Sequence, residues 1–294
     1  MLLTCYSVPS CLCLALWLVA LTAPAALRAE TGYEAWLRCA AIDDDRVRQH
    51  YAGLPAVVVA FGDSPVIRAA QEELVRGLRG MLGRTLRVEG RLPRESAVIL
   101  GTLGALAQAA PALRLAADLA EDGYWLKTLT VGGLPHLIIA GPNDRGVLYG
   151  VFALLRKIAL HEPAVPLDEK QEPYAPVRWV NEWNNLDGSI ERGYGGRSIF
   201  YDKNDVRADL SRVRDYARLL ASLGINGCAV NNVNANPRVI TTEFLPQLAR
   251  LAEVFRPWGV RVALAIDFSS PRKIGGLDTF DPLDPRVAQW WKEK

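Results

Sequence analysis

The chain has 294 residues, of which 50% are hydrophobic and 22% are charged, and its formal net charge is +2. This composition is typical of a globular protein that buries a core, and at roughly 150 residues per domain the length predicts two domains. Basic residues form no stripe with interleaved aromatics, so the sequence predicts no nucleic-acid partner.

Residues 1–29 have the pattern of a secretory signal peptide. An apolar run from Leu12 to Leu21 is too short to span a bilayer, and small residues follow it, with cleavage fitting after Ala25 or Ala29. We therefore expect a secreted or periplasmic protein without a membrane span. No Lys or Arg precedes the apolar run, and a misassigned start codon, which would give a cytoplasmic protein, is the alternative.

The spacing of cysteines and histidines predicts neither a disulfide framework nor a metal site. After cleavage only Cys39 and Cys228 would remain, and they lie far apart in the sequence. Cys228 stands in an apolar run and is expected to be a buried small side chain. The three histidines are scattered and belong to no metal-binding motif. We expect no metal and no cofactor.

Residues 30–170 are predicted to form an N-terminal α/β domain. An apolar strand is expected at 56–61, and after it an amphipathic helix that Ser64 caps and Pro65 begins. A second short strand is expected at 97–101, with a tight turn into a helix after it.

The same domain continues with a hairpin and a further helix. The hairpin is expected at 124–140, around a Gly-Gly turn that requires positive φ. A helix capped by Asn143 or Asp144 follows. Residues 161–176 are rich in Pro, Glu and Asp and lack periodicity, which predicts a linker.

Residues 171–294 alternate strands with helices. Continuous apolar strands separated by helices predict parallel pairing, as in a (β/α)8 barrel. The dinucleotide fingerprint of a Rossmann domain is absent after the first strand. A whole barrel needs about 250 residues, so we expect only its first part here. The predicted strands are 177–183, 225–233 and 260–268, and the predicted helices are 204–223, 242–258 and 284–294.

Barrel enzymes place their chemistry at the carboxyl ends of the strands. Here those positions hold Glu182 and Trp183, then Asn231 to Val233, and then Asp267. An aromatic platform beside amides and carboxylates is typical of a sugar site. Each residue also has a plainer interpretation: the Trp as core, the asparagines as a turn, and Asp267 as a structural hydrogen-bond acceptor.

Three motifs in order resemble the α-glucuronidases of glycoside hydrolase family 67. The first surrounds the first predicted barrel strand, the second follows the next helix, and the third precedes the last helix. They are 181–200 (NEWNNLDGSIERGYGGRSIF), 224–235 (GINGCAVNNVNA) and 270–285 (SPRKIGGLDTFDPLDP).

This resemblance implies an enzyme that removes α-1,2-linked glucuronic acid, or its 4-O-methyl ether, from xylooligosaccharides with inversion and without a cofactor. Family members have an N-terminal α/β domain, a catalytic barrel and a C-terminal helical domain that mediates dimerisation. The expected partners are therefore glucuronic-acid-decorated xylooligosaccharides and a second copy of the enzyme.

The resemblance also implies site residues. Trp183 and Val233 match residues that line the pocket around the sugar's 4-position, and we include Asn232 and Glu182 among the substrate-binding residues. The general acid and base are expected beyond Lys294. No catalytic residue is therefore expected within this chain, which alone should be inactive.

One position departs from the family pattern. Asn184 stands where the family usually has Asp. Without that carboxylate charge, Arg192 or Arg197 would be held less firmly in the loop. Glu191 and Arg192 are expected to form a structural ion pair. Two other functions remain open: a β-hexosaminidase-like glycosidase, and a non-catalytic carbohydrate-binding protein, which Asn184 favours.

Overall fold

The computed structural model describes residues 32–294, and the predicted leader lies outside them. The chain divides into a short unit, Met1–Trp36, and a larger one, Leu37–Lys294. The 3-10 helix η1 (Ala35–Arg38) spans this division, and the other described helices and strands lie in the larger unit. Among the described residues, no helix is both long and apolar enough to cross a membrane.

A six-stranded sheet organises the first part of the larger unit. Its strands are β1 (Val57–Phe61), β2 (Arg87–Glu89), β3 (Val98–Thr102), β4 (Tyr124–Val131), β5 (Leu134–Gly141) and β6 (Asp168–Gln171). Their order is β2-β1-β3-β5-β4-β6. The first four strands in this order run parallel, whereas β4 is antiparallel to both of its neighbours. The central strands are continuously apolar because helices cover both of their faces.

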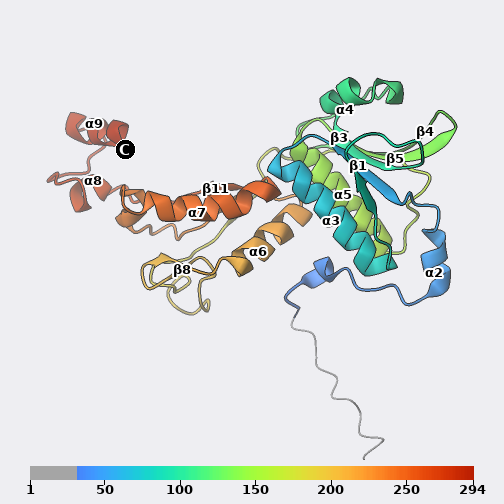
Figure 1. The fold of residues 1–294 in the computed structure, drawn as a ribbon. Coiled ribbons are helices and arrows are strands. Elements are labelled where there is room, and N and C mark those ends of the chain that lie inside the picture. The colour runs from blue at the N-terminus through green and yellow to red at the C-terminus, as the bar shows by residue number, and fades with distance from the viewer. Residues whose placement is uncertain (1–31) are drawn as a thin grey trace, which may run out of the picture. The chain divides into compact units, whose positions relative to one another are not determined.

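Two long helices lie side by side against the sheet (Figure 1). They are α3 (Pro65–Leu82) and α5 (Asp144–Ala159). The helices are in close contact at Gly77, where an added Cβ would lie only 2.5 Å from Leu155 Cδ2. Glycine is therefore needed there for contact, since a larger side chain would push the helices apart.

The two faces of the sheet have separate cores. Ile138 packs in a buried cluster that includes side chains from α4 (Leu103–Ala109) and from η2 (Pro111–Leu113). The next residue, Ile139, points the other way and packs against α5 at Gly150. This alternation is the period-two pattern of a strand buried on both sides.

The predicted helix starts of this part are confirmed. Ser64 Oγ accepts a hydrogen bond from Ile67 N at 3.1 Å, and the Asn143 side chain accepts one from Gly146 N at 2.9 Å. Thr102 caps α4 in the same way, which confirms the tight turn expected after the second strand. Each cap satisfies a backbone N–H that has no partner within its helix.

The predicted hairpin is also confirmed, but the predicted linker is wrong in one part. Gly132 and Gly133 turn the hairpin with φ of 60° and 83°. Within 161–176, however, β6 forms and pairs with β4 at the sheet edge. Its residues are mostly exposed and all polar, so no apolar periodicity marked the strand; backbone pairing with β4 holds it.

Three short parallel strands organise the second part. They are β7 (Trp179–Asn181), β10 (Gly227–Ala229) and β11 (Arg261–Ala263), in the order β11-β10-β7. Helices α6 (Ser211–Ser222) and α7 (Leu245–Phe255) connect them in sequence. The alternation and parallel pairing predicted from the sequence are therefore confirmed, and with them the α/β class.

The predicted helix at 204–223 is wrong at its start. Residues 201–206 instead form a small antiparallel hairpin of β8 (Tyr201–Asp202) and β9 (Asp205–Val206), which turns at Lys203 and Asn204 with φ of 51° and 65°. Asparagine tolerates this left-handed conformation, which a helix start does not use. The remaining elements are α2 (Asp45–His50), η3 (Pro237–Ile240), η4 (Arg256–Trp258), α8 (Ser270–Lys273) and α9 (Pro285–Glu293).

Charged side chains connect the two parts. Arg218 on α6 donates to both carboxylate oxygens of Glu73 on α3, at 2.9 and 2.5 Å, and both side chains are buried. Asp122, which precedes β4, receives Arg145 from its own part and Arg178 from the segment before β7. These pairs join α6 and the segment before β7 to the first part.

Candidate functional site

The carboxyl ends of the three parallel strands lie at one level. Asn181 is in register with Ala229, and Ala229 with Ala263. The segments that follow these residues therefore leave the sheet along a common edge, which is where the sequence placed the sugar site.

Trp183 and Glu182 follow β7 on opposite faces. Glu182 N donates to Ala229 O at 2.8 Å, so the chain is still extended there and consecutive side chains alternate. The Tyr216 hydroxyl on α6 donates to the Glu182 carboxylate, which therefore faces the helix layer. The Trp183 side chain is turned away from it, and the residue is 41% exposed.

The Glu182 carboxylate lies near Tyr216 and Cys228. Burial, followed by the hydrogen bond to Glu182, raises the pKa of Tyr216 far above its usual range. Burial and then the Glu182 charge also raise the pKa of the Cys228 thiol, which is fully buried, as the sequence predicted. Glu182 is therefore placed to orient the end of β7, and its carboxylate is not directed with Trp183 toward a common ligand.

Asn231 and Asn232 make the hydrogen bonds that connect the end of β10 to its neighbours. The Asn231 side chain accepts from Ala265 N at 2.8 Å and donates to Ala265 O at 3.0 Å, and so bridges to the segment after β11. Asn232 N donates to Asn184 O at 2.8 Å. This bond ties the residue after Trp183 to the residue before Val233, and Val233 is 47% exposed. An indole and a small aliphatic side chain are thus both solvent-accessible beside one backbone link.

Asp267 has structural partners. Its carboxylate accepts from Ser269 N at 2.8 Å, from Ser269 Oγ at 2.7 Å and from Lys273 Nζ at 2.7 Å. Burial alone would raise the pKa of this carboxyl, but Lys273 and Ser269 hold it below its usual range. The interpretation as a structural acceptor therefore fits this residue better than a role in proton transfer.

The loop after β7 contains the position that departs from the family pattern. Asn184 is 2% exposed, and its backbone carbonyl accepts the bond from Asn232 N. Glu191 and Arg192 form the expected ion pair, with 3.5 Å between Oε1 and Nε. Arg197 instead reaches Asp202 at 3.5 Å. Neither arginine depends on a charge at position 184.

A polar cavity of about 350 Å³ lies behind this loop. We call it the asparagine pocket, because most of its polar lining consists of asparagine side chains; Leu186, Asp187, Lys273 and the residues around η3 complete its walls. The asparagines are Asn184, Asn185, Asn204, Asn231, Asn232, Asn234 and Asn236.

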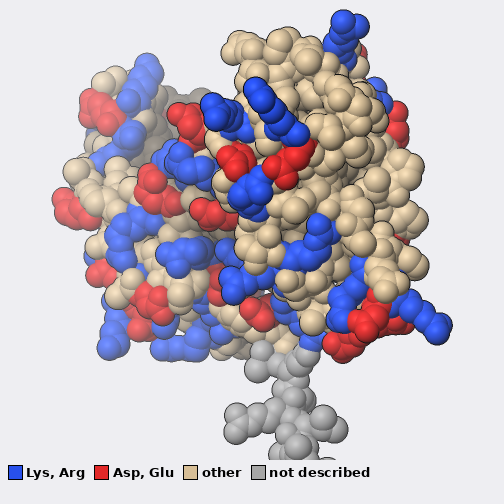
Figure 2. Space-filling model, turned by 45° about the vertical axis from the view of Figure 1, so that its right-hand side comes forward, with Lys and Arg blue, Asp and Glu red and all other residues tan. Residues whose placement is uncertain are grey.

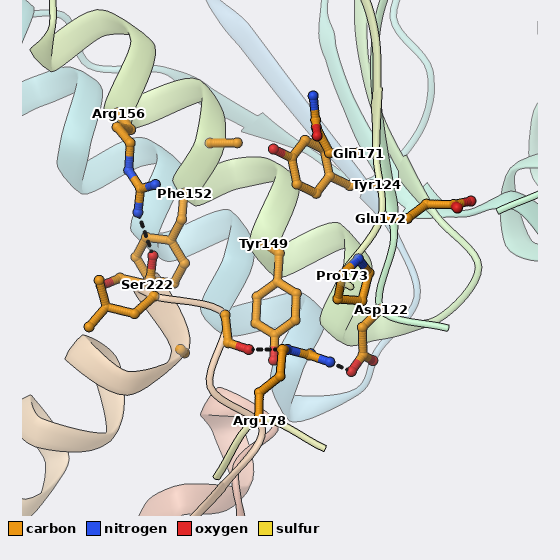
Figure 3. Close-up of a pocket in the computed structure, with 14 residues that line it drawn as sticks. Asp122, Tyr124, Tyr149, Phe152, Arg156, Gln171, Glu172, Pro173, Arg178 and Ser222 are labelled. Carbon is orange, nitrogen blue, oxygen red and sulfur yellow. Dashed lines mark hydrogen bonds and ion pairs between the residues drawn. The ribbon is translucent and has the colours of Figure 1, made fainter. Parts of the chain in front are cut away.

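A second cavity, of about 280 Å³, lies at the opposite end of β7 (Figure 3). In this view Arg178 lies beneath the ring of Tyr149 and reaches Asp122. Arg178 Nε also donates to Gly224 O at 2.6 Å, and Arg156 donates to Ser222 O at 3.0 Å. These arginine contacts hold the end of α6 against the first part, so the cavity is a structural junction.

Asp122 is the centre of this junction. Burial alone would raise the pKa of its carboxyl, but hydrogen bonds from Arg145, Arg178 and Asn143 hold the pKa below its usual range. A carboxylate with several charge-assisted donors stays ionised and contributes to stability.

Neither the surface charge nor the placement of His, Cys, Asp and Glu side chains points to a particular class of ligand. Acidic and basic side chains are interspersed over the face shown in Figure 2. In residues 32–294, no three His, Cys, Asp or Glu side chains gather as a metal site would need. Cys39 and Cys228 are free and buried.

Sequence reasoning missed two features of the site. Tyr216 lies mid-helix on α6, and nothing in its spacing indicated a carboxylate partner 34 residues away. The asparagine pocket had a visible signal, since the segment from Asn226 to Asn236 (NGCAVNNVNAN) is rich in amides. The contribution of Asn204 depends on the β8–β9 hairpin, which the sequence did not predict.

Two family models match the chain in order. The glycosyl hydrolase family 67 N-terminus matches residues 35–154, and the family 67 middle domain matches residues 157–294. Together these two models cover most of the chain, and both describe parts of a glycoside hydrolase. The chain belongs to glycoside hydrolase family 67. The resemblance of the three motifs is thereby confirmed, and the hexosaminidase-like alternative falls away.

Curated relatives agree with this assignment. Alpha-glucuronidase A of Emericella nidulans is 45% identical over 289 residues, which are 95% of this chain and 33% of that protein. Alpha-glucuronidase of Hypocrea jecorina is 40% identical over 291 residues, which are 95% and 34% of the two chains. The chain spans about a third of the length of these relatives.

Solved structures show the fold. A family GH115 4-O-methyl-α-glucuronidase with specificity for decorated arabinogalactans superposes with a TM-score of 0.53 at 18% identity, covering 82% of this chain and 34% of its own. A GH138 enzyme that targets pectin rhamnogalacturonan II gives a TM-score of 0.50 at 13% identity, covering 80% and 36%.

Proposed function

We propose that the enzyme containing this chain is an α-glucuronidase that removes α-1,2-linked glucuronic acid, or its 4-O-methyl ether, from xylooligosaccharides with inversion. The observation that carries the proposal is the exposed indole of Trp183 beside Val233 at the shared edge of three parallel strands. It occurs in a chain 45% identical to a curated α-glucuronidase.

In this proposal the described strand ends bind and orient the uronic acid. The Trp183 ring packs against the apolar face of the sugar, and Val233 leaves space beside its 4-position. Asn232 holds the backbone between them through its bond to Asn184. Glu182, bound to Tyr216, acts as a positioning residue for Trp183 and not as the direct sugar contact expected from the sequence.

Inversion requires a carboxylic acid and a carboxylate base about 6.5–9.5 Å apart, on opposite sides of the glycosidic bond. The two carboxylates at the described strand ends already have partners: Glu182 binds Tyr216, and Asp267 binds Ser269 and Lys273. We therefore assign the acid and base to other strand ends of the complete barrel.

The test is release of glucuronic acid by the full-length enzyme from aldouronic acids. We expect release, with the β-anomer appearing first in a time course by proton NMR. Initial appearance of the α-anomer would contradict inversion. Binding of aldouronic acids without any release would instead favour the carbohydrate-binding protein suggested by Asn184.

Three further parts of the proposal concern the complete protein. We place the boundary between its α/β domain and its barrel at residue 170, immediately before the end of β6. We also propose that residues 1–29 direct secretion, and that the enzyme is a dimer through a C-terminal domain. Limited proteolysis tests the domain boundary, N-terminal sequencing of the mature protein tests the role of residues 1–29, and light scattering tests the dimer.

A further inference from the structure

The cavity where the two parts of the larger unit meet, which we call the junction cavity, is remote from the proposed uronic acid site. Arg178, which lines it, precedes β7, whereas Trp183 follows β7. At roughly 3.3 Å per residue of extended chain, a separation of five residues corresponds to a distance on the order of 15 Å. A ligand in the junction cavity is therefore separate from the sugar that contacts Trp183.

The charged groups of the junction cavity already have partners. Arg178 donates to Asp122 at 2.8 Å. Arg156 donates to Ser222 O at 3.0 Å, and the Glu172 carboxylate accepts from a backbone N–H at 2.8 Å. Two guanidinium groups and two carboxylates thus balance each other in the lining. The cavity is therefore better matched to a neutral ligand than to an ion.

An aromatic ring and an amide stand side by side on one wall of the cavity. Tyr124 on β4 pairs directly with Gln171 on β6, so both side chains lie on the same face of the sheet. Figure 3 shows Gln171 next to the Tyr124 ring. Tyr124 also packs closely against α5, where a Cβ added at Gly150 would lie 3.2 Å from Tyr124 Cβ. This contact with the helix holds the ring in place.

Both side chains have polar groups that a ligand can reach. Tyr124 is half-buried and Gln171 is exposed. Within residues 32–294, no hydrogen bond joins the Tyr124 hydroxyl or the Gln171 side-chain amide to another group. A hydroxyl and an amide can each donate and accept, as the hydroxyls of a sugar do. At about 280 Å³, close to the lower limit for ligand sites, the cavity has room for one ring.

We propose that the junction cavity is a second carbohydrate site, which binds one neutral sugar ring of a polysaccharide. The apolar face of the sugar packs on the Tyr124 ring, and its hydroxyls bond to the Tyr124 hydroxyl and the Gln171 amide. Leu223, which is 56% exposed, forms an apolar edge of the same cavity. Such a site holds the enzyme on a polymer while the strand ends act on its side groups. Naming xylan as that polymer rests on the proposed function.

Two variants of the full-length enzyme test the site, with xylan that carries no glucuronic acid as the probe in affinity electrophoresis. Ala153→Trp fills the cavity from α5. Excluding the sugar ring removes its ring contact and its hydrogen bonds, and should weaken the apparent affinity by about tenfold or more. Gln171→Ala removes one hydrogen bond and should weaken it about two- to tenfold. Release of glucuronic acid from short aldouronic acids should be unchanged in both variants.

Matched controls make the same changes outside the cavity. Ala52→Trp and Gln49→Ala alter exposed positions in and after α2, and both should bind xylan as the wild type does. If Ala153→Trp fails to fold, Gln171→Ala decides alone. No retardation of the wild type, or unchanged retardation in a folded cavity variant, overturns the proposal. Retardation that depends on Gln171, in an enzyme that releases no glucuronic acid, would reject only the proposed function.

Discussion

The indole of Trp183 is the side chain on which the proposed activity depends most directly. It is partly exposed at a strand end, so Trp183→Ala should leave the melting temperature of the full-length enzyme nearly unchanged. Loss of a stacking contact worth roughly 1–3 kcal/mol should lower kcat/KM about ten- to a hundredfold. Tyr174→Ala, which removes a fully exposed aromatic ring from the segment between β6 and β7, should alter neither quantity. A loss of activity explained wholly by unfolding would make Trp183 a core residue.

Val233 should affect selectivity and not the chemistry. In the proposed pocket it borders the 4-position, where the substrate carries either a hydroxyl or a methoxyl group. Val233→Asn replaces an exposed apolar surface with an amide that hydrogen-bonds the free hydroxyl. We expect the ratio of kcat/KM for methylated over unmethylated substrate to fall by about tenfold, measured with the two aldouronic acids. An unchanged ratio would remove Val233 from the pocket.

At this scale the sequence indicated which residues stand at the strand ends but not where their side chains point. Trp183 and Glu182 are neighbours in sequence and look equally suited to bind a sugar. The hydroxyl of Tyr216, on helix α6, donates a hydrogen bond to the Glu182 carboxylate. Glu182 therefore faces the helix layer, and Trp183 faces the opposite side. Such a partnership is a tertiary contact, and no local pattern in the sequence encodes it.

At the scale of helices and strands, apolar periodicity predicted most elements and missed those without it. The strands β1 and β3 carry clear apolar patterns, and the helix α3 carries an apolar pattern and an N-cap. All three lie within a residue or two of their predicted bounds. β6 is polar and exposed, so only its pairing with β4 reveals it. α6 begins late because the turn at Asn204 adopts positive φ.

The contact between α6 and α3 depends on a buried ion pair. Arg218→Met would leave the Glu73 carboxylate buried without its bidentate partner, and we expect a loss of about 3–5 kcal/mol in the free energy of unfolding. Urea denaturation of the full-length enzyme measures it.

The matched control is Arg76→Met. Arg76 also faces Glu73, at 3.5 Å, but its side chain is 53% exposed, and a surface pair of this kind contributes at most about 1 kcal/mol. In Arg218→Met, replacing Glu73 with Met as well should restore much of the lost stability, because no buried charge then remains. Equal losses in the two single variants would show that Arg218 is not the dominant partner.

For the whole molecule, the junction around Asp122 predicts a dependence of stability on pH. The folded-state pKa of Asp122 lies below its usual value, so the unfolded chain binds the proton more readily. Its contribution is complete above the unfolded pKa of about 3.9 and is lost as pH falls through the folded pKa. Melting temperature should therefore decrease as the pH falls below about 5, and should go on decreasing until the folded pKa is passed.

Asp122→Asn should lower the melting temperature at neutral pH and make its decrease toward acid shallower, since the variant has no such proton to bind. Asp43→Asn, at an exposed position before α2, serves as the control and should keep the wild-type profile. Parallel profiles for Asp122→Asn and the wild type would show that other carboxyls determine the acid sensitivity.

The side-chain bridge from Asn231 to Ala265 has a consequence for how this enzyme can change over evolution. The Asn231 side-chain amide donates one hydrogen bond to the Ala265 backbone and accepts one from it, as the backbone of one more strand residue would. The pairing of β10 with the segment after β11 therefore ends in register. After Asn231, the bond from Asn232 N to Asn184 O is the last backbone link from this segment to a neighbouring strand end among the described residues. The chain from Val233 onward can therefore accept insertions and substitutions without shifting the sheet. Substrate preference can diverge in this loop, while Asn231 itself stays constrained.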